Sequence, residues 1–167
     1  MPDFRTLDGV NVSGQRVLIR VDLNVPMENG RVTDMTRISR VAPTIAELAD
    51  KGAKVVVLSH FGRPGGKPVP EMSLRPLVEP LAAALKRPVS FAEDCVGIKA
   101  KQVVELMKAG DIVLLENLRW ISMRAMTQRD GVCLEDDRTE DQVHFTAAGY
   151  ARIVREIRKA AGMPARR

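Results

Sequence analysis

The sequence predicts an α/β fold in which a parallel sheet is covered by helices on both faces, a three-layer αβα arrangement. Short runs rich in β-branched residues alternate with longer segments of helical period between residues 16 and 120, which is typical of βαβ units. The runs VLIRV, VVVL and IVLL are apolar almost throughout, as expected for strands covered on both faces. We therefore expect strands at Arg16–Val21, Lys54–Ser59 and Asp111–Glu116.

Three helices are expected around this sheet, at Asp34–Asp50, Ser73–Leu85 and about Asp94–Ala109. Asp34 and Ser73 are suited to cap the first two helices, because a short polar side chain accepts a hydrogen bond from the first turn. Gly52 and Gly110 follow the first and third helices and favour their ends. Pro80 lies inside the second helix and should kink it or cost up to about 3 kcal/mol.

Composition limits the class of protein. The chain has 167 residues, of which 45% are hydrophobic and 28% charged, and no apolar run approaches the roughly 20 residues needed to cross a bilayer. The net charge is +5, but Lys and Arg are scattered among few aromatic residues, so nucleic acid is not predicted as a partner. Cys95 and Cys133 have no CxxC spacing, so neither a disulfide framework nor a zinc site is predicted. With no secretory signal at the N-terminus, we expect a cytoplasmic protein without a membrane partner.

Polar side chains follow each predicted strand, where ligands of parallel sheets bind. Asp22 and Asn24 come after the first strand, and His60 and Arg63 come after the second, in a loop rich in glycine. Taken singly, each motif is explained equally well as a solvated strand end or an ordinary turn. Arg37 is less easily explained, because a cation in the first turn of a helix opposes the helix dipole unless an anion lies nearby.

The third strand is followed by Glu116, Asn117 and Arg119, a motif that is weak alone. Together with the other strand ends, it predicts a cluster of guanidinium groups and one imidazole at one edge of the sheet. Guanidinium groups suit bidentate binding of phosphate and carboxylate. We therefore expect a site for a small phosphorylated or carboxylated metabolite, and no nucleotide site, because the pattern GxxxxGK[ST] does not occur. The cationic members are Arg20, Arg37, His60, Arg63 and Arg119.

The segment RVLIRVDLNVP is similar to the signature of the phosphoglycerate kinase family, and four further motifs follow in that family's order: TDMTRI, LSHFGRPGGK, FAEDCVG and LLENLRW. The resemblance covers about residues 5–120 and implies a Rossmann-like fold, the N-terminal domain that binds 3-phosphoglycerate. It implies that Asp22 and Asn24 hold the hydroxyl region of the substrate, and that Arg37 is catalytic and stabilises the transferring phosphoryl group. It also implies that His60 and Arg37 lie near the substrate carboxylate, and Arg63 and Arg119 around its phosphate. For Arg20 we expect a structural ion pair.

In the family, MgATP or MgADP binds to a second domain, and the phosphoryl group passes between the nucleotide and 3-phosphoglycerate. The resemblance ends near Trp120, so we expect an incomplete sheet at 1–120, an irregular connector at 121–145, and a helix with a basic end at 146–167 outside the family pattern. This chain is expected to bind no nucleotide on its own, and to bind 3-phosphoglycerate without catalysis. A non-catalytic module for a small phosphorylated acid is the alternative. An exposed sheet edge would favour self-association.

The tail EDQVHFTAAGYARI resembles the last block of SGNH-type esterases, in which an Asp and a His complete a catalytic triad. Asp141 and His144 would be those residues here, and a fusion with an esterase remnant is a further alternative. However, the serine nucleophile belongs to a GDS motif, and no GDS occurs in the chain. The pair is better explained by the start of a helix capped by Thr146, and we expect no esterase activity from the tail.

Overall fold

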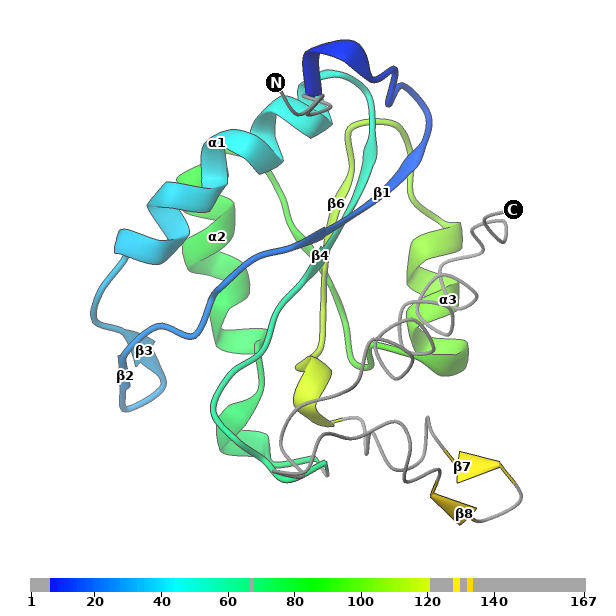
Figure 1. The fold of residues 1–167 in the computed structure, drawn as a ribbon. Helices are drawn as coiled ribbons and strands as arrows, with labels where there is room; N and C mark the ends of the chain where they lie inside the picture. Colours follow the sequence, from blue (N-terminus) through cyan, green and yellow to red (C-terminus); the bar gives the residue numbers. More distant parts are fainter. Residues whose placement is uncertain (1–6, 67, 121–127, 130–131, 134–167) are drawn as a thin grey trace, which may run out of the picture.

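The computed structural model describes residues 7–66, 68–120, 128–129 and 132–133. Its centre is a four-stranded parallel sheet with the strand order β1-β4-β6-β5 (Figure 1). The strands are β1 (Arg16–Arg20), β4 (Lys54–Leu58), β6 (Ile112–Leu115) and β5 (Ser90–Ala92). The three predicted strands are confirmed within a residue or two, and the predicted α/β class is correct.

The helices cover both faces of the sheet, as the three-layer prediction requires. Helices α1 (Thr36–Asp50) and α2 (Val78–Leu85) pack on one face, and α3 (Gly97–Glu105) lies on the other (Figure 1). Since side chains alternate along a strand, Val57 and Leu114 belong to the core under α1 and α2, whereas Val56 faces the α3 side. All three are completely buried. Two apolar layers therefore hold the sheet rigid and position the loops at its edge.

The helix boundaries differ from the predicted ones for local reasons. Helix α1 begins at Thr36, and the carboxylate of Asp34 accepts the Thr36 N–H at 2.7 Å just before it. Pro80 does not lie in the interior of a helix as predicted, because the segment divides into the 3₁₀ turn η3 (Arg75–Leu77) and α2. Pro80 then stands in the first turn of α2, where its missing N–H has no helical partner to lose. Helix α3 ends at Glu105, earlier than expected.

Several short elements were not predicted. Strand β5 has only three residues, too few for an alternating pattern. Strands β2 (Met27–Glu28) and β3 (Arg31–Val32) form an antiparallel hairpin around Asn29 and Gly30, both at positive φ, the conformation that an Asn-Gly turn favours. The other 3₁₀ turns are η1 (Leu7–Gly9), η2 (Pro70–Met72) and η4 (Leu118–Trp120).

Beyond residue 120 the structure describes one antiparallel pair, β7 (Gln128–Arg129) with β8 (Val132–Cys133), within the predicted connector. Asp141, His144 and the predicted C-terminal helix lie outside the described residues. None of the described helices is long and apolar enough to cross a membrane. Cys95 is a free thiol, and burial raises its pKa above the ordinary value. A buried neutral thiol of this kind is chemically inert.

Candidate anion-binding site

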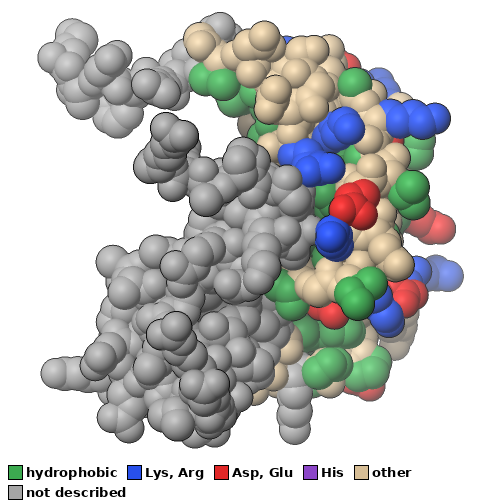
Figure 2. Space-filling model, turned by 90° about the vertical axis from the view of Figure 1, so that its right-hand side faces the viewer, with side chains coloured by type: hydrophobic (Ala, Val, Ile, Leu, Met, Phe, Trp, Pro, Cys, Tyr) green, Lys and Arg blue, Asp and Glu red, His purple; other side chains and the backbone are tan. Residues whose placement is uncertain are grey.

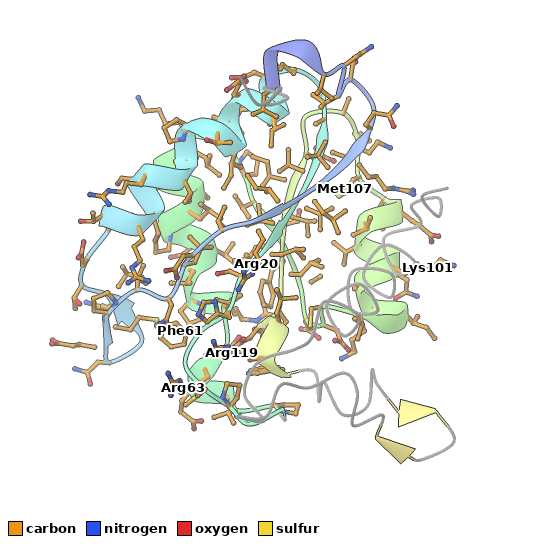
Figure 3. The ribbon with its side chains drawn as sticks, in the orientation of Figure 1. Arg20, Phe61, Arg63, Lys101, Met107 and Arg119 are labelled. Carbon is orange, nitrogen blue, oxygen red and sulfur yellow. The ribbon has the colours of Figure 1, made fainter. Side chains whose placement is uncertain are left out.

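The carboxyl ends of the parallel strands meet at the lower edge of the molecule in Figure 1, and the predicted site residues gather there. Asp22 and Asn24 follow β1, His60 and Arg63 follow β4, and Arg119 lies in η4 after β6. Figure 3 shows Arg63 and Arg119 near Phe61 at this edge, with Arg20 above them. Lys101 lies on α3, on the opposite side of the view.

Arg37 meets the carboxylate of Asp22, which explains how a cation is tolerated in the first turn of α1. Its Nη1 donates to Asp22 Oδ2, and the backbone N–H of Asn24 donates to Asp22 Oδ1 at 3.0 Å. Partial burial acts to raise the pKa of Asp22, but the Asn24 N–H and the Arg37 guanidinium outweigh it and hold the pKa below the ordinary value. Both side chains are about half exposed, at 49% and 55%. The pair is therefore accessible to a ligand.

Asn24 ties the end of β1 to the loop after β4. Its Oδ1 accepts the backbone N–H of Gly62 at 3.0 Å, and its Nδ2 group makes no hydrogen bond to another described residue, so it could donate to a ligand. Gly62 has a φ of +60°, and a Cβ at this position would lie 2.8 Å from the sulfur of Met72. The positive φ favours glycine here, and a side chain at this position would also displace the flexible end of Met72.

Arg119, which follows β6, contacts the loop after β4. Its Nη1 donates to the carbonyl oxygen of Gly62 at 2.8 Å, and the residue is exposed. Arg63 and Arg20 are also exposed, and neither side chain makes a hydrogen bond or ion pair with a described residue. The structural ion pair expected for Arg20 is therefore not formed within the described part of the chain.

His60 is partly buried among these charges. Burial and the positive charge of Arg119 lower the pKa of His60 below its ordinary value of 6.5, and the Asp22 carboxylate opposes this in part. Arg20 and Arg37 lower the pKa further. Since the guanidinium groups of Arg20, Arg37 and Arg119 act on His60 together with the Asp22 carboxylate, this edge of the sheet is predominantly cationic and suited to an anion.

The titration of His60 is predicted to report an anion at this site. The neutral imidazole is favoured in the fold, so its contribution to stability is present above pH 6.5 and is lost as the pH falls through the lower pKa of the folded state. A bound anion favours the imidazolium and should raise this pKa. NMR of the ring protons measures both states, and His144→Gln assigns the signals because the chain has two histidines. An unchanged pKa at saturating phosphate would place the anion elsewhere.

Glu116 and Asn117 were expected after the third strand, but their hydrogen-bond partners were not predicted. Ser59 was not identified as a residue that supports the site. All three are buried at the strand ends. The Ser59 hydroxyl oxygen accepts the backbone N–H of Leu23 at 2.9 Å, which joins β4 to the segment after β1. A polar residue at the end of a fully apolar strand is the signal that could have identified Ser59, because a buried hydroxyl must find a partner.

The surface around α3 exposes a different mixture of side chains from the carboxyl edge of the sheet. On the described surface visible in Figure 2, Lys and Arg side chains alternate with acidic and hydrophobic ones and do not form one continuous patch. Ile98 and Leu106, at 75% and 81% exposure, lie on or just after α3. Among the described residues, no group of three or more His, Cys, Asp or Glu side chains is arranged to hold a metal ion.

Comparison with known proteins agrees with this architecture. The family model described as phosphoglycerate kinase matches residues 7–145, which extends past Trp120. The chain is 60% identical over 117 residues to a phosphoglycerate kinase of Granulibacter bethesdensis, covering 70% of this chain and 30% of the relative. It is 62% identical over 117 residues to that of Bradyrhizobium diazoefficiens, covering 70% and 29%.

Two solved structures share the fold. The phosphoglycerate kinase of Pyrococcus horikoshii matches with a TM-score of 0.64 and 33% identity, and covers 71% of this chain and 29% of that one. The Coxiella burnetii structure of the same name matches with a TM-score of 0.61 and 36% identity, with the same coverage. This chain thus spans about 30% of the length of its relatives. From the match over residues 7–145 and these identities, the chain belongs to the phosphoglycerate kinase family.

Proposed function

We propose that the carboxyl edge of this sheet binds 3-phosphoglycerate for phosphoryl transfer to or from a nucleotide. The observation that carries the proposal is the gathering of cationic side chains from three separate elements around Asp22 and Asn24, in a member of the phosphoglycerate kinase family. A substrate with a phosphate at one end and a carboxylate at the other needs two cationic regions. In this proposal, Arg63 and Arg119 form one such region, and Arg37 and His60 form the other.

The exposed guanidinium groups of Arg63 and Arg119 are proposed to bind the phosphate, because their N–H donors are arranged for bidentate contacts. His60 and Arg37 would lie at the carboxylate, with the hydroxyl held by Asp22 and the Nδ2 group of Asn24. Arg37 is the proposed catalytic residue. Once Arg37 leaves Asp22, its charge would stabilise the equatorial oxygens of the transferring phosphoryl group.

We propose that the described residues do not bind MgATP or MgADP, the nucleotides that the family uses. They contain no GxxxxGK[ST] pattern, and no cluster of carboxylates among them is arranged to hold Mg²⁺. We propose that nucleotide binding belongs to the part of the relatives that this chain does not match. A polypeptide of these 167 residues would then bind the substrate without turning it over, in a domain that ends near residue 120, with a connector at 121–145 and a helix at 146–167.

Calorimetric titration of the 167-residue chain with 3-phosphoglycerate tests the proposal. We expect saturable binding that weakens with salt, since charge attraction is screened. Arg37→Ala should weaken binding by about tenfold, corresponding to one charge-assisted hydrogen bond. Lys101→Ala is the matched control, because it removes a cation on α3 far from the site (Figure 3) and should leave binding unchanged. Absence of heat from folded protein would contradict the proposal.

Self-association through β1 is proposed as well. Within the described residues, the outer edge of β1 has no strand partner, and an open strand edge favours pairing with another chain. We expect the weight-average mass in sedimentation equilibrium to rise with protein concentration. A constant monomer mass over the whole concentration range would contradict this.

A further inference from the structure

Asn117 is a completely buried polar side chain at the point where β6 ends. Its Nδ2 donates to the carbonyl oxygens of Phe61 at 2.7 Å and Met72 at 2.8 Å. Its Oδ1 accepts the backbone N–H of Arg119 at 3.0 Å. Both N–H donors and the carbonyl oxygen are thus used within the protein, and none is left for a ligand.

The two carbonyl groups that meet Asn117 stand at the two ends of the loop after β4. Between them lie three glycines, at positions 62, 65 and 66, all at positive φ. A loop with this composition has wide conformational freedom, and closing it costs entropy. One amide group that binds both ends therefore restricts the loop that carries Arg63.

The side-chain amide of Asn117 also holds the backbone of Arg119. The Arg119 backbone is held by Asn117 Oδ1, and its guanidinium returns to the carbonyl oxygen of Gly62 at 2.8 Å. The N–H of Gly62 is in turn bound to Asn24 at 3.0 Å. A continuous set of hydrogen bonds therefore joins the segments after β1, β4 and β6. Asn117 is its only completely buried side chain, since Asn24 and Arg119 are exposed.

Glu116 holds the backbone of Asn117 in place through buried hydrogen bonds. Its Oε1 accepts the N–H groups of Leu74 at 2.8 Å and of Asn117 itself at 2.7 Å, and its Oε2 accepts the Ser73 hydroxyl at 2.6 Å. The backbone of Asn117 is thereby held against the segment that follows the loop.

We propose that Asn117 is a positioning residue of the anion site, one that sets the spacing between Arg63 and Arg119 and makes no contact with the ligand. The inference rests on the proposed function for its ligand, 3-phosphoglycerate. A residue with a purely structural role would change stability alone. A positioning residue also changes the affinity of the folded protein.

The test uses Asn117→Asp in the full chain. Aspartate has the same shape and keeps the acceptor for Arg119, but it replaces the two donors with lone pairs that face two carbonyl oxygens. We expect 3-phosphoglycerate to bind at least about tenfold more weakly, measured by calorimetry at a temperature at which the variant is folded. The matched control is Val104→Ala, a buried position on α3, which lowers the melting temperature and should leave affinity within about twofold. Equal affinity in Asn117→Asp and wild type, or equal weakening in both variants, would overturn the inference.

A second measurement separates this inference from the proposed function. If wild-type protein binds no 3-phosphoglycerate, the proposed function fails. Amide hydrogen exchange still tests whether Asn117 holds the hydrogen-bonded segments in place. We expect the Gly62 amide to exchange at least about tenfold faster in Asn117→Asp than in Val104→Ala at matched distance from the melting temperature. Equal exchange in the two variants would overturn the positioning role. Should Asn117→Asp fail to fold, Asn117→Ser, which keeps one donor and one acceptor, takes its place with the same criteria.

Discussion

Replacing Glu116 with alanine is expected to lower the free energy of unfolding by about 3 kcal/mol or more. The carboxylate is 3% exposed and accepts three hydrogen bonds, from the Ser73 hydroxyl and the N–H groups of Leu74 and Asn117. Alanine leaves these donors without a partner, and each unsatisfied buried group costs about 1–3 kcal/mol. Since domains are stable by only about 5–15 kcal/mol, the loss should be visible in urea denaturation.

Two further substitutions make the Glu116 prediction specific. Glu105→Ala removes an exposed carboxylate at the end of α3 that pairs with Lys101 at 3.6 Å, and should change stability by less than about 0.5 kcal/mol. Glu116→Gln keeps an acceptor for the two backbone N–H groups and should cost less than alanine. If Glu116→Ala is as stable as Glu105→Ala, the buried network does not support the fold.

Arg119→Ala is expected to weaken 3-phosphoglycerate binding by about a hundredfold. The substitution removes the proposed partner of the substrate phosphate and also the bond from its Nη1 to the Gly62 carbonyl oxygen. Charge-assisted hydrogen bonds contribute about 1.5–3 kcal/mol each, and a hundredfold change corresponds to about 2.7 kcal/mol. Calorimetric titration of the folded variant measures the loss.

The control for Arg119 is an arginine at the other end of the sheet. Arg87 follows α2 and pairs with Asp50 at 2.6 Å, near the C-terminal ends of both helices. Arg87→Ala removes the same charge and should leave affinity within about twofold. Arg119→Lys keeps the charge but loses the planar fork, so intermediate affinity is expected. Comparable losses in the Arg87 and Arg119 variants would show that net charge, rather than this site, governs binding.

Strong local patterns made much of the fold predictable from sequence. Strand β6 and the part of β4 after Lys54 are apolar and buried, and the stripe of α1 that includes Ile38 and Ile45 faces the core as its spacing predicts. Strand β5 could not be found in this way, because three residues show no period. The position of Pro80 in the helix was mispredicted because the sequence pattern did not show that α2 begins only at Val78. Pro80 therefore lies in the first turn, where its ring is tolerated.

The candidate site was predictable only in outline. The topology of a parallel sheet brings strand ends together, and so Asp22, His60 and Arg119 could be placed at one edge before the structure was known. The pairing of Arg37 with Asp22 and the bridging role of Asn117 depend on contacts between residues far apart in the chain. Such contacts leave no local pattern in one sequence.

An NMR titration of the ¹⁵N-labelled 167-residue chain with 3-phosphoglycerate tests the central claim most directly. The proposed site predicts saturable shifts of the amides of Gly62, Gly65 and Arg119 and of the His60 ring, with the amides of α3 unmoved. Shifts centred on α3, or no shifts from folded protein at millimolar ligand, would contradict the assignment of the anion site to the carboxyl edge of the sheet.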